Sequence, residues 1–119
     1  IGRCDLCLVT PYSPNTPFSV GTAMGRNKLI YTLADYAIVV ASDVEKGGTW
    51  AGATEALKSK WIPIFVLNYP DMPEGNKMLI QKGALQFPHP FPEHYLKLRI
   101  WLEGQSAMVK PTFNQPTLF

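Results

Sequence analysis

Two short polar stretches contain the residues that could hold an anion, and the first is Arg26-Asn27-Lys28. The apolar residues that follow recur at the spacing of one helical face, so a helix is predicted over residues 26–35. Cations are disfavoured at a helix N-terminus, because that end already carries partial positive charge. The triplet is therefore either solvated surface or a sign that an anion binds nearby.

The second stretch is Lys46-Gly47-Gly48-Thr49, which follows a predicted strand and opens a predicted helix with Thr49 as its N-cap. Glycines let backbone N–H groups approach an anion, and the helix N-terminus adds positive charge. Together the two stretches would form a phosphate-binding wall at the carboxyl ends of parallel strands. The pattern is neither a dinucleotide fingerprint nor a P-loop, and a tight turn with close helix packing is the alternative explanation.

Catalytic chemistry has less support. Four carboxylates lie in positions suited to acid or base chemistry: Asp35, Asp43, Glu45 and Glu55. Nothing in the sequence pairs them with one another. No Ser-His-Asp or Cys-His arrangement is suggested. Four aromatic residues lie in or beside the same loops, where each serves either packing or the stacking of a base: Tyr12, Phe18, Trp50 and Tyr69.

The two cysteines, Cys4 and Cys7, form a C-x-x-C pair. Such a pair can be redox-active or can supply half of a zinc site, and a zinc site needs about four ligands. His89 and His94 lack the usual finger spacing. We therefore predict two buried or half-buried thiols and no metal.

Apolar runs and helical periods alternate along the chain. Strands are predicted over residues 5–11, 36–41, 62–68 and 84–87, and helices over 26–35, 49–60, 76–83 and 93–105. This alternation predicts βαβ crossovers and a parallel sheet. Three or four parallel strands make a small sheet that needs cover on its faces and edges, so we expect further strands on the N-terminal side or a partner chain.

The composition is typical of one folded domain. The 119 residues are 46% hydrophobic and 17% charged, and the net charge of +2 neither demands nor excludes a nucleic-acid partner. No apolar run approaches the roughly 20 residues that span a bilayer. No signal peptide is visible, so we expect a cytoplasmic protein without a membrane partner. The chain starts at Ile1 rather than at Met, which suggests processing or a piece of something longer.

Three motifs, in this order, resemble the DNA-processing protein A (DprA, or Smf) family. They are "GRNKLI" at residues 25–30, "KGGTWAGA" at 46–53 and "LIQKGA" at 79–84. The resemblance extends over about residues 6–88 and implies a Rossmann-like α/β fold, a parallel sheet with flanking helices, of which this chain is the C-terminal part. On this basis residues 1–90 form the Rossmann-like unit, and residues 91–119 form a closing helix and an extended tail.

The resemblance also implies a function, which is to bind single-stranded DNA and hand it to a RecA-type recombinase in natural transformation and recombination. It implies no catalysis and no cofactor, and it leaves a homodimer open. The family's Arg-Asn pair lies in a basic DNA pocket, a role that carries over to Arg26 and Asn27 and more loosely to Lys28. The family's Ser-Gly-Ser loop lies near that pocket, so residues 46–49 are second-rank candidates for phosphate binding.

The sequence departs from the family pattern in two places. The Phe-Pro that precedes the family's Arg-Asn pair is absent, so Phe18 or Tyr12 would have to supply the aromatic ring for base stacking. The family's Gly-Ser-Arg loop, which lies on an earlier strand, is not in this chain. Half of the DNA pocket would then come from elsewhere.

A second resemblance is to the LOG, or lysine-decarboxylase-like, proteins, which cleave nucleoside monophosphates at the glycosidic bond. The stretch "KGGTWAGATE" contains the double glycine and a glutamate of their motif. The motif's proline is missing, and Glu55 comes one residue late, which argues against a hydrolase. A nucleotide-cleaving enzyme or a nucleotide-binding sensor on the same scaffold is the alternative hypothesis.

Overall fold

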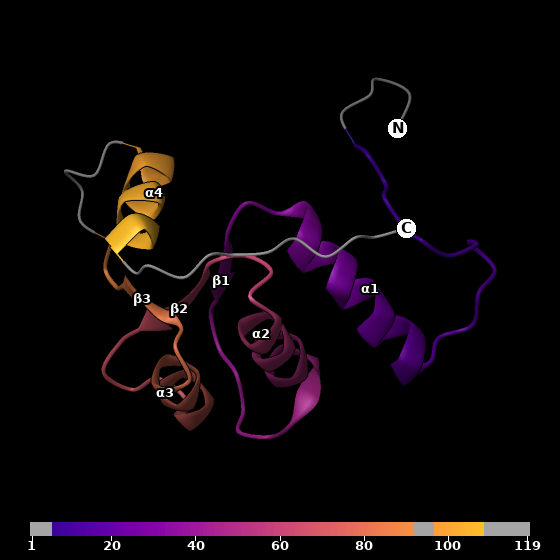
Figure 1. The fold of residues 1–119 in the computed structure, drawn as a ribbon. Coiled ribbons are helices and arrows are strands. Elements are labelled where there is room, and N and C mark those ends of the chain that lie inside the picture. Colours follow the sequence, from indigo (N-terminus) through magenta and orange to yellow (C-terminus); the bar gives the residue numbers. More distant parts are fainter. Residues whose placement is uncertain (1–5, 92–96, 109–119) are drawn as a thin grey trace.

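The structure is a computed structural model that describes residues 6–91 and 97–108. Its elements in chain order are α1 (Val20–Leu33), β1 (Ala37–Val39), α2 (Gly47–Ser59), β2 (Ile64–Asn68), α3 (Glu74–Gln81), β3 (Leu85–Pro88) and α4 (Leu98–Met108), as Figure 1 shows. The strands form one parallel sheet in the order β1-β2-β3. The predicted α/β fold, a parallel sheet with flanking helices, is confirmed.

The side chains of the central strand β2 alternate between the two faces of the sheet. Ile64 and Val66 pack with residues of α2 and α3 in one buried core. Phe65 points to the opposite face, where its ring centroid lies 5.6 Å from that of Trp101 in α4. Helices α2 and α3 therefore cover one face of the sheet and α4 covers the other, as Figure 1 shows.

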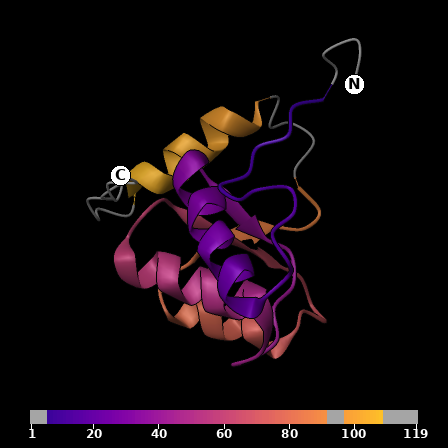
Figure 2. The ribbon, with the colours of Figure 1, turned by 90° about the vertical axis from the view of Figure 1, so that its right-hand side faces the viewer.

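Helix α1 lies beside α2 at the β1 end of the sheet (Figures 1 and 2). It begins six residues earlier than predicted, because Ser19 and Thr22 form a capping box in which each side chain accepts a hydrogen bond from the other's backbone N–H, at 3.0 and 3.1 Å. Arg26 and Lys28 consequently lie in the middle of the helix. The prediction that these basic residues open a helix is therefore wrong, and their position no longer conflicts with the helix dipole.

The predicted first strand is also wrong. Residues 6–10 form no strand, and their apolar side chains are exposed, with Leu8 76% accessible to solvent. A strand needs a neighbour for its backbone hydrogen bonds, and no strand in the described part of the chain pairs with this segment. Cys7 is exposed rather than buried, and Cys4 lies outside the described residues.

The remaining predicted elements are present with shifted ends. Helix α2 begins at Gly47, with Lys46 as its N-cap, so the predicted Thr49 cap is wrong. Helix α3 starts two residues earlier than predicted, and β1 is shorter. Helix α4 is described from Leu98, and the predicted first turn at residues 93–96 lies outside the described residues. The proposed boundary near residue 90 stays a prediction.

None of the helices within residues 6–91 and 97–108 has the length and apolar character required to cross a membrane. Within the same ranges, no three His, Cys, Asp or Glu side chains come together as metal ligands.

Candidate functional site

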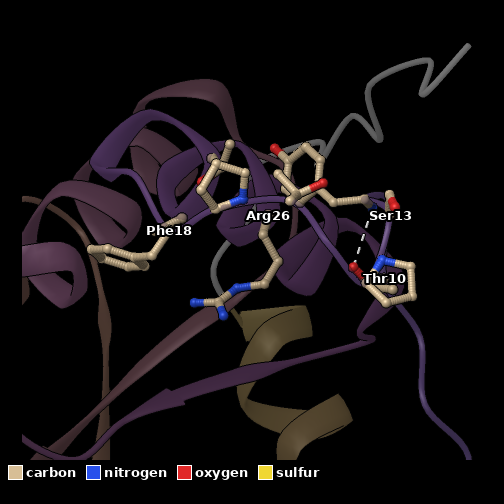
Figure 3. A pocket seen from close by; sticks show the side chains of 10 residues that line it. Thr10, Ser13, Phe18 and Arg26 are labelled. Carbon is tan, nitrogen blue, oxygen red and sulfur yellow. Dashed lines mark hydrogen bonds between the residues drawn. The ribbon is translucent and has the colours of Figure 1, made fainter.

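Arg26 lies on the outer side of α1, beside the loop that precedes the helix. Loop and helix enclose an open hollow of about 320 Å³, and its lining residues are Thr10, Tyr12, Ser13, Pro14, Thr16, Pro17, Phe18, Thr22, Ala23 and Arg26. Figure 3 shows the Arg26 side chain with Phe18 on one side and Thr10 and Ser13 on the other. The fold thus brings Arg26 together with both predicted stacking residues, and we call this the Arg26 surface.

The two aromatic residues of the Arg26 surface differ in how they are held. Tyr12 is half-buried, and its hydroxyl lies where a side chain at Gly25 would begin, 2.5 Å from an ideal Cβ there. Gly25 therefore lets the loop lie close against α1. Phe18 is 86% exposed, so nearly the whole ring is available to stack on a base.

The guanidinium of Arg26 carries an unneutralised charge. It donates a long hydrogen bond of 3.5 Å from Nη2 to Oδ1 of Asn27, and none of the carboxylates in the described residues lies within ion-pair distance of it. An exposed guanidinium in this state can bind a phosphate through two parallel N–H donors.

Asn27 is half-buried, and its amide nitrogen faces α2 while its Oδ1 accepts the hydrogen bond from Arg26. Its Nδ2 lies 3.6 Å from the ideal Cβ positions of both Gly48 and Gly52, and Tyr31 lies 3.0 Å from that of Gly52. Gly48 and Gly52 therefore form the surface of α2 on which α1 packs, which agrees with the helix-packing explanation for Gly48, whereas an ideal Cβ at Gly47 would have no atom within 4 Å. Burial raises the pKa of the Tyr31 phenol above its usual value, so this packing surface stays uncharged at neutral pH.

Lys28 does not join Arg26. Two residues along an α-helix correspond to a rotation of about 200°, so the two side chains leave α1 on nearly opposite sides. The Nζ of Lys28 lies 5.8 Å from the ring centroid of Trp61, in a cation–π contact. The predicted basic triplet is therefore split between two surfaces.

The predicted residues at the start of α2 do lie together. They line a second open hollow of about 220 Å³, whose residues are Ala41, Ser42, Asp43, Lys46, Gly47, Gly48, Thr49 and Pro73. Lys46 is exposed, and no side chain caps the N-terminus of α2. Asp43 places a negative charge in the same hollow, which opposes anion binding. This hollow shares no lining residue with the Arg26 surface.

Asn76 on α3 is a residue that the sequence analysis missed. Its side chain is completely buried, accepts a hydrogen bond from the Ser42 N–H at 2.9 Å and donates to the carbonyls of Val40 and Leu67, both at 3.0 Å. It thereby joins the carboxyl ends of β1 and β2 to the loop that leads into α2. The one available signal is helical phase, because Asn76 shares a face with Leu79.

Comparison with known proteins gives both a family and a related fold. The family model of DNA recombination-mediator protein A matches residues 3–91 of this chain. No curated protein matches it significantly. A solved structure of DNA processing protein A from Helicobacter pylori, described for its single-stranded DNA binding mode, superimposes with a TM-score of 0.58 at 22% identity.

The superposition covers 83% of this chain but 42% of the Helicobacter pylori chain, so the residues described here correspond to part of a domain. At this identity the superposition establishes the fold alone. The family assignment rests on the family model, which extends over most of the chain and contains all three motifs that carried the resemblance. The chain belongs to the DNA recombination-mediator protein A family.

Proposed function

We propose that this chain binds single-stranded DNA and that the Arg26 surface is its contact with the strand. The observation that supports the proposal most directly is the exposed guanidinium of Arg26 without a carboxylate partner, beside the exposed ring of Phe18. A phosphate would bind to Arg26, and a base would stack on Phe18. This pairing of a cation with an aromatic ring is the usual design of sites for single strands.

The arrangement favours a single strand over a duplex. A base can stack on a protein ring only when it has left its own stack, which costs less in a single strand than in paired DNA. The hollow is also open, which suits a passing DNA strand better than an enclosed small molecule.

The other predicted site residues take different parts in the proposal. Asn27 positions α1 against Gly48 and leaves the phosphate to Arg26. Lys46, with the N–H groups of Gly48 and Thr49, is a second-rank contact further along the DNA strand. Transfer of the strand to a RecA-type recombinase belongs to the same proposal and calls for no catalysis by this chain. Glu55 is an exposed side chain on α2, and nothing around it favours the nucleotide-cleaving alternative.

Fluorescence anisotropy with a labelled oligo-dT, at low and at physiological salt, tests the proposal. We expect salt-dependent binding that neither duplex DNA nor a mononucleotide displaces. Arg26→Ala should weaken binding and flatten the dependence of log K on log salt by about 0.7, the value for one phosphate on a single strand.

Arg99→Ala is the matched control. Arg99 is also an exposed arginine, but its charge is paired with Asp35 at 3.3 Å and with Glu103 at 3.0 Å. Equal effects of the two substitutions would remove Arg26 from the site. Displacement of the oligonucleotide by a mononucleotide would support a nucleotide site instead.

A further inference from the structure

The hollow of the Arg26 surface is lined by hydroxyl groups as well as by the guanidinium, and these hydroxyls are not equivalent. They belong to Thr10, Ser13, Thr16 and Thr22. The Thr22 hydroxyl is already used in the capping box, because it accepts the Ser19 N–H at 3.1 Å and donates to the Ser19 carbonyl at 3.0 Å. The Thr16 hydroxyl makes no hydrogen bond within the described residues, so nothing there fixes its direction.

Thr10 and Ser13 differ from these two because a backbone N–H group holds each hydroxyl oxygen in place. Thr10 Oγ1 accepts the Tyr12 N–H at 3.1 Å, the dashed line in Figure 3, and Ser13 Oγ accepts the Asn15 N–H at 3.4 Å. A hydroxyl oxygen that accepts a hydrogen bond still has its own proton to donate. Both side chains are exposed, and none of the described residues accepts that proton. Each hydroxyl is therefore an oriented donor that lacks an acceptor in the described part of the chain.

The charge of the hollow restricts what these donors can bind. Among the described residues that line it, Arg26 is the one charged side chain, and no carboxylate is present. The hollow at the start of α2 differs in this respect, because Asp43 lines it. One guanidinium with neutral donors beside it complements a group that carries one negative charge and only accepts hydrogen bonds. A phosphodiester is such a group.

We infer that the Thr10 hydroxyl, with that of Ser13 beside it, is a second donor to the phosphodiester that Arg26 binds, an inference that rests on the function proposed above. Figure 3 shows the Arg26 guanidinium between the Phe18 ring and the two hydroxyl-bearing residues. The phosphate then lies on the Thr10 side of the guanidinium, and a base stacks on the Phe18 side. The two parts of the DNA strand thereby bind at separate places on one loop.

The alternative role for Thr10 is to hold the loop in shape, since its oxygen binds the N–H of Tyr12, and Tyr12 packs against Gly25. The two roles predict different couplings. A donor to the phosphate loses its effect once Arg26 no longer binds that phosphate. A residue that holds the loop would instead act through Phe18, which lies on the same loop, and would lose its effect in the absence of that ring.

Fluorescence anisotropy with labelled oligo-dT at low salt, on Thr10→Val alone and combined with Arg26→Ala or Phe18→Ala, tests the inference. Valine is similar in shape to threonine and lacks the hydroxyl. Thr10→Val should raise the Kd by about five- to tenfold, the range for loss of one hydrogen bond to a charged group. The salt dependence should be unchanged, because a neutral donor releases no counterion. The effect should fall below about twofold beside Arg26→Ala and persist beside Phe18→Ala.

Two further variants serve as controls. Thr10→Ser keeps the hydroxyl and should bind like the unsubstituted chain. Ser59→Ala removes an exposed hydroxyl at the end of α2, away from the hollow, and should change nothing. Oligo-dT with a 5′-phosphate and with a 5′-hydroxyl should bind equally, since the phosphate in question lies within the strand.

The outcomes separate this inference from the proposed function. No binding of oligo-dT by the unsubstituted chain, or binding that Arg26→Ala leaves unchanged, would overturn the proposed site and the inference together. If Arg26→Ala does weaken binding, three results would overturn the inference alone. They are an unchanged Kd in Thr10→Val, an effect of Thr10→Val that depends on Phe18 rather than on Arg26, and tighter binding of the 5′-phosphorylated oligonucleotide.

Discussion

Asn76 and Arg26 are polar side chains in opposite surroundings, and the regions around them differ in the same way. Asn76 is completely buried and makes three hydrogen bonds of 2.9–3.0 Å that join two strand ends and a loop. Arg26 is exposed and makes one hydrogen bond of 3.5 Å to its neighbour. A polar group that is buried and fully paired has no capacity left for a ligand, whereas an exposed unpaired cation has all of it. We therefore infer a folding role for Asn76, in contrast to the binding role proposed for Arg26.

The largest expected effect is a loss of stability on substitution of Asn76. Asn76→Ala removes the three hydrogen bonds of a completely buried side chain, so the free energy of unfolding should fall by about 3 kcal/mol or more. Urea unfolding followed by circular dichroism measures the change. Asn68→Ala is the control, because the Asn68 side chain makes its hydrogen bond, to Gln86 at 2.8 Å, at the exposed end of β2. Equal losses in the two variants would contradict the assignment of Asn76 to folding.

The next largest effect is expected on DNA binding, for the substitution of Phe18 beside Arg26. Phe18→Ala removes an exposed ring, so the free energy of unfolding should change by less than about 0.5 kcal/mol. The Kd for oligo-dT should rise about tenfold, within the range of about 1–3 kcal/mol for one stacked base. Anisotropy and urea unfolding on the same sample separate the two quantities. Ile100→Ala, which truncates an exposed apolar side chain on α4, should change neither, and a loss of stability in Phe18→Ala would end its assignment to binding.

The same comparison explains which parts of the molecule the sequence could predict. Strands β1 and β2 and helices α2, α3 and α4 follow from apolar runs and helical periods, because these patterns reflect burial on one face. The start of α1 was missed because Gly21 and Gly25 weaken the helical pattern, while the Ser19–Thr22 capping box lies within a stretch that resembles a loop.

Features that depend on neighbours could not be predicted in this way. The apolar pattern of residues 6–10 indicates a strand, but a strand forms only when another strand pairs with it. Asn76 looks like a solvated helix residue until the ends of β1 and β2 are placed around it. The convergence of Arg26 with Phe18 depends on the fold of the loop before α1, and the separation of Arg26 from Lys28 depends on α1 starting at Val20.

Lys28 gives the smallest expected effect and the sharpest check on how far the binding region extends. It lies two residues from Arg26, yet its ammonium contacts Trp61 on the other side of α1. Lys28→Ala should lower the free energy of unfolding by about 0.5 kcal/mol, the value of an exposed cation–π contact. It should leave the salt dependence of DNA binding unchanged, like the control Lys58→Ala on the exposed end of α2. If Lys28→Ala flattens the salt dependence as much as Arg26→Ala does, the strand must pass around α1 rather than along one side of it, and binding and packing would then share the same surface of that helix.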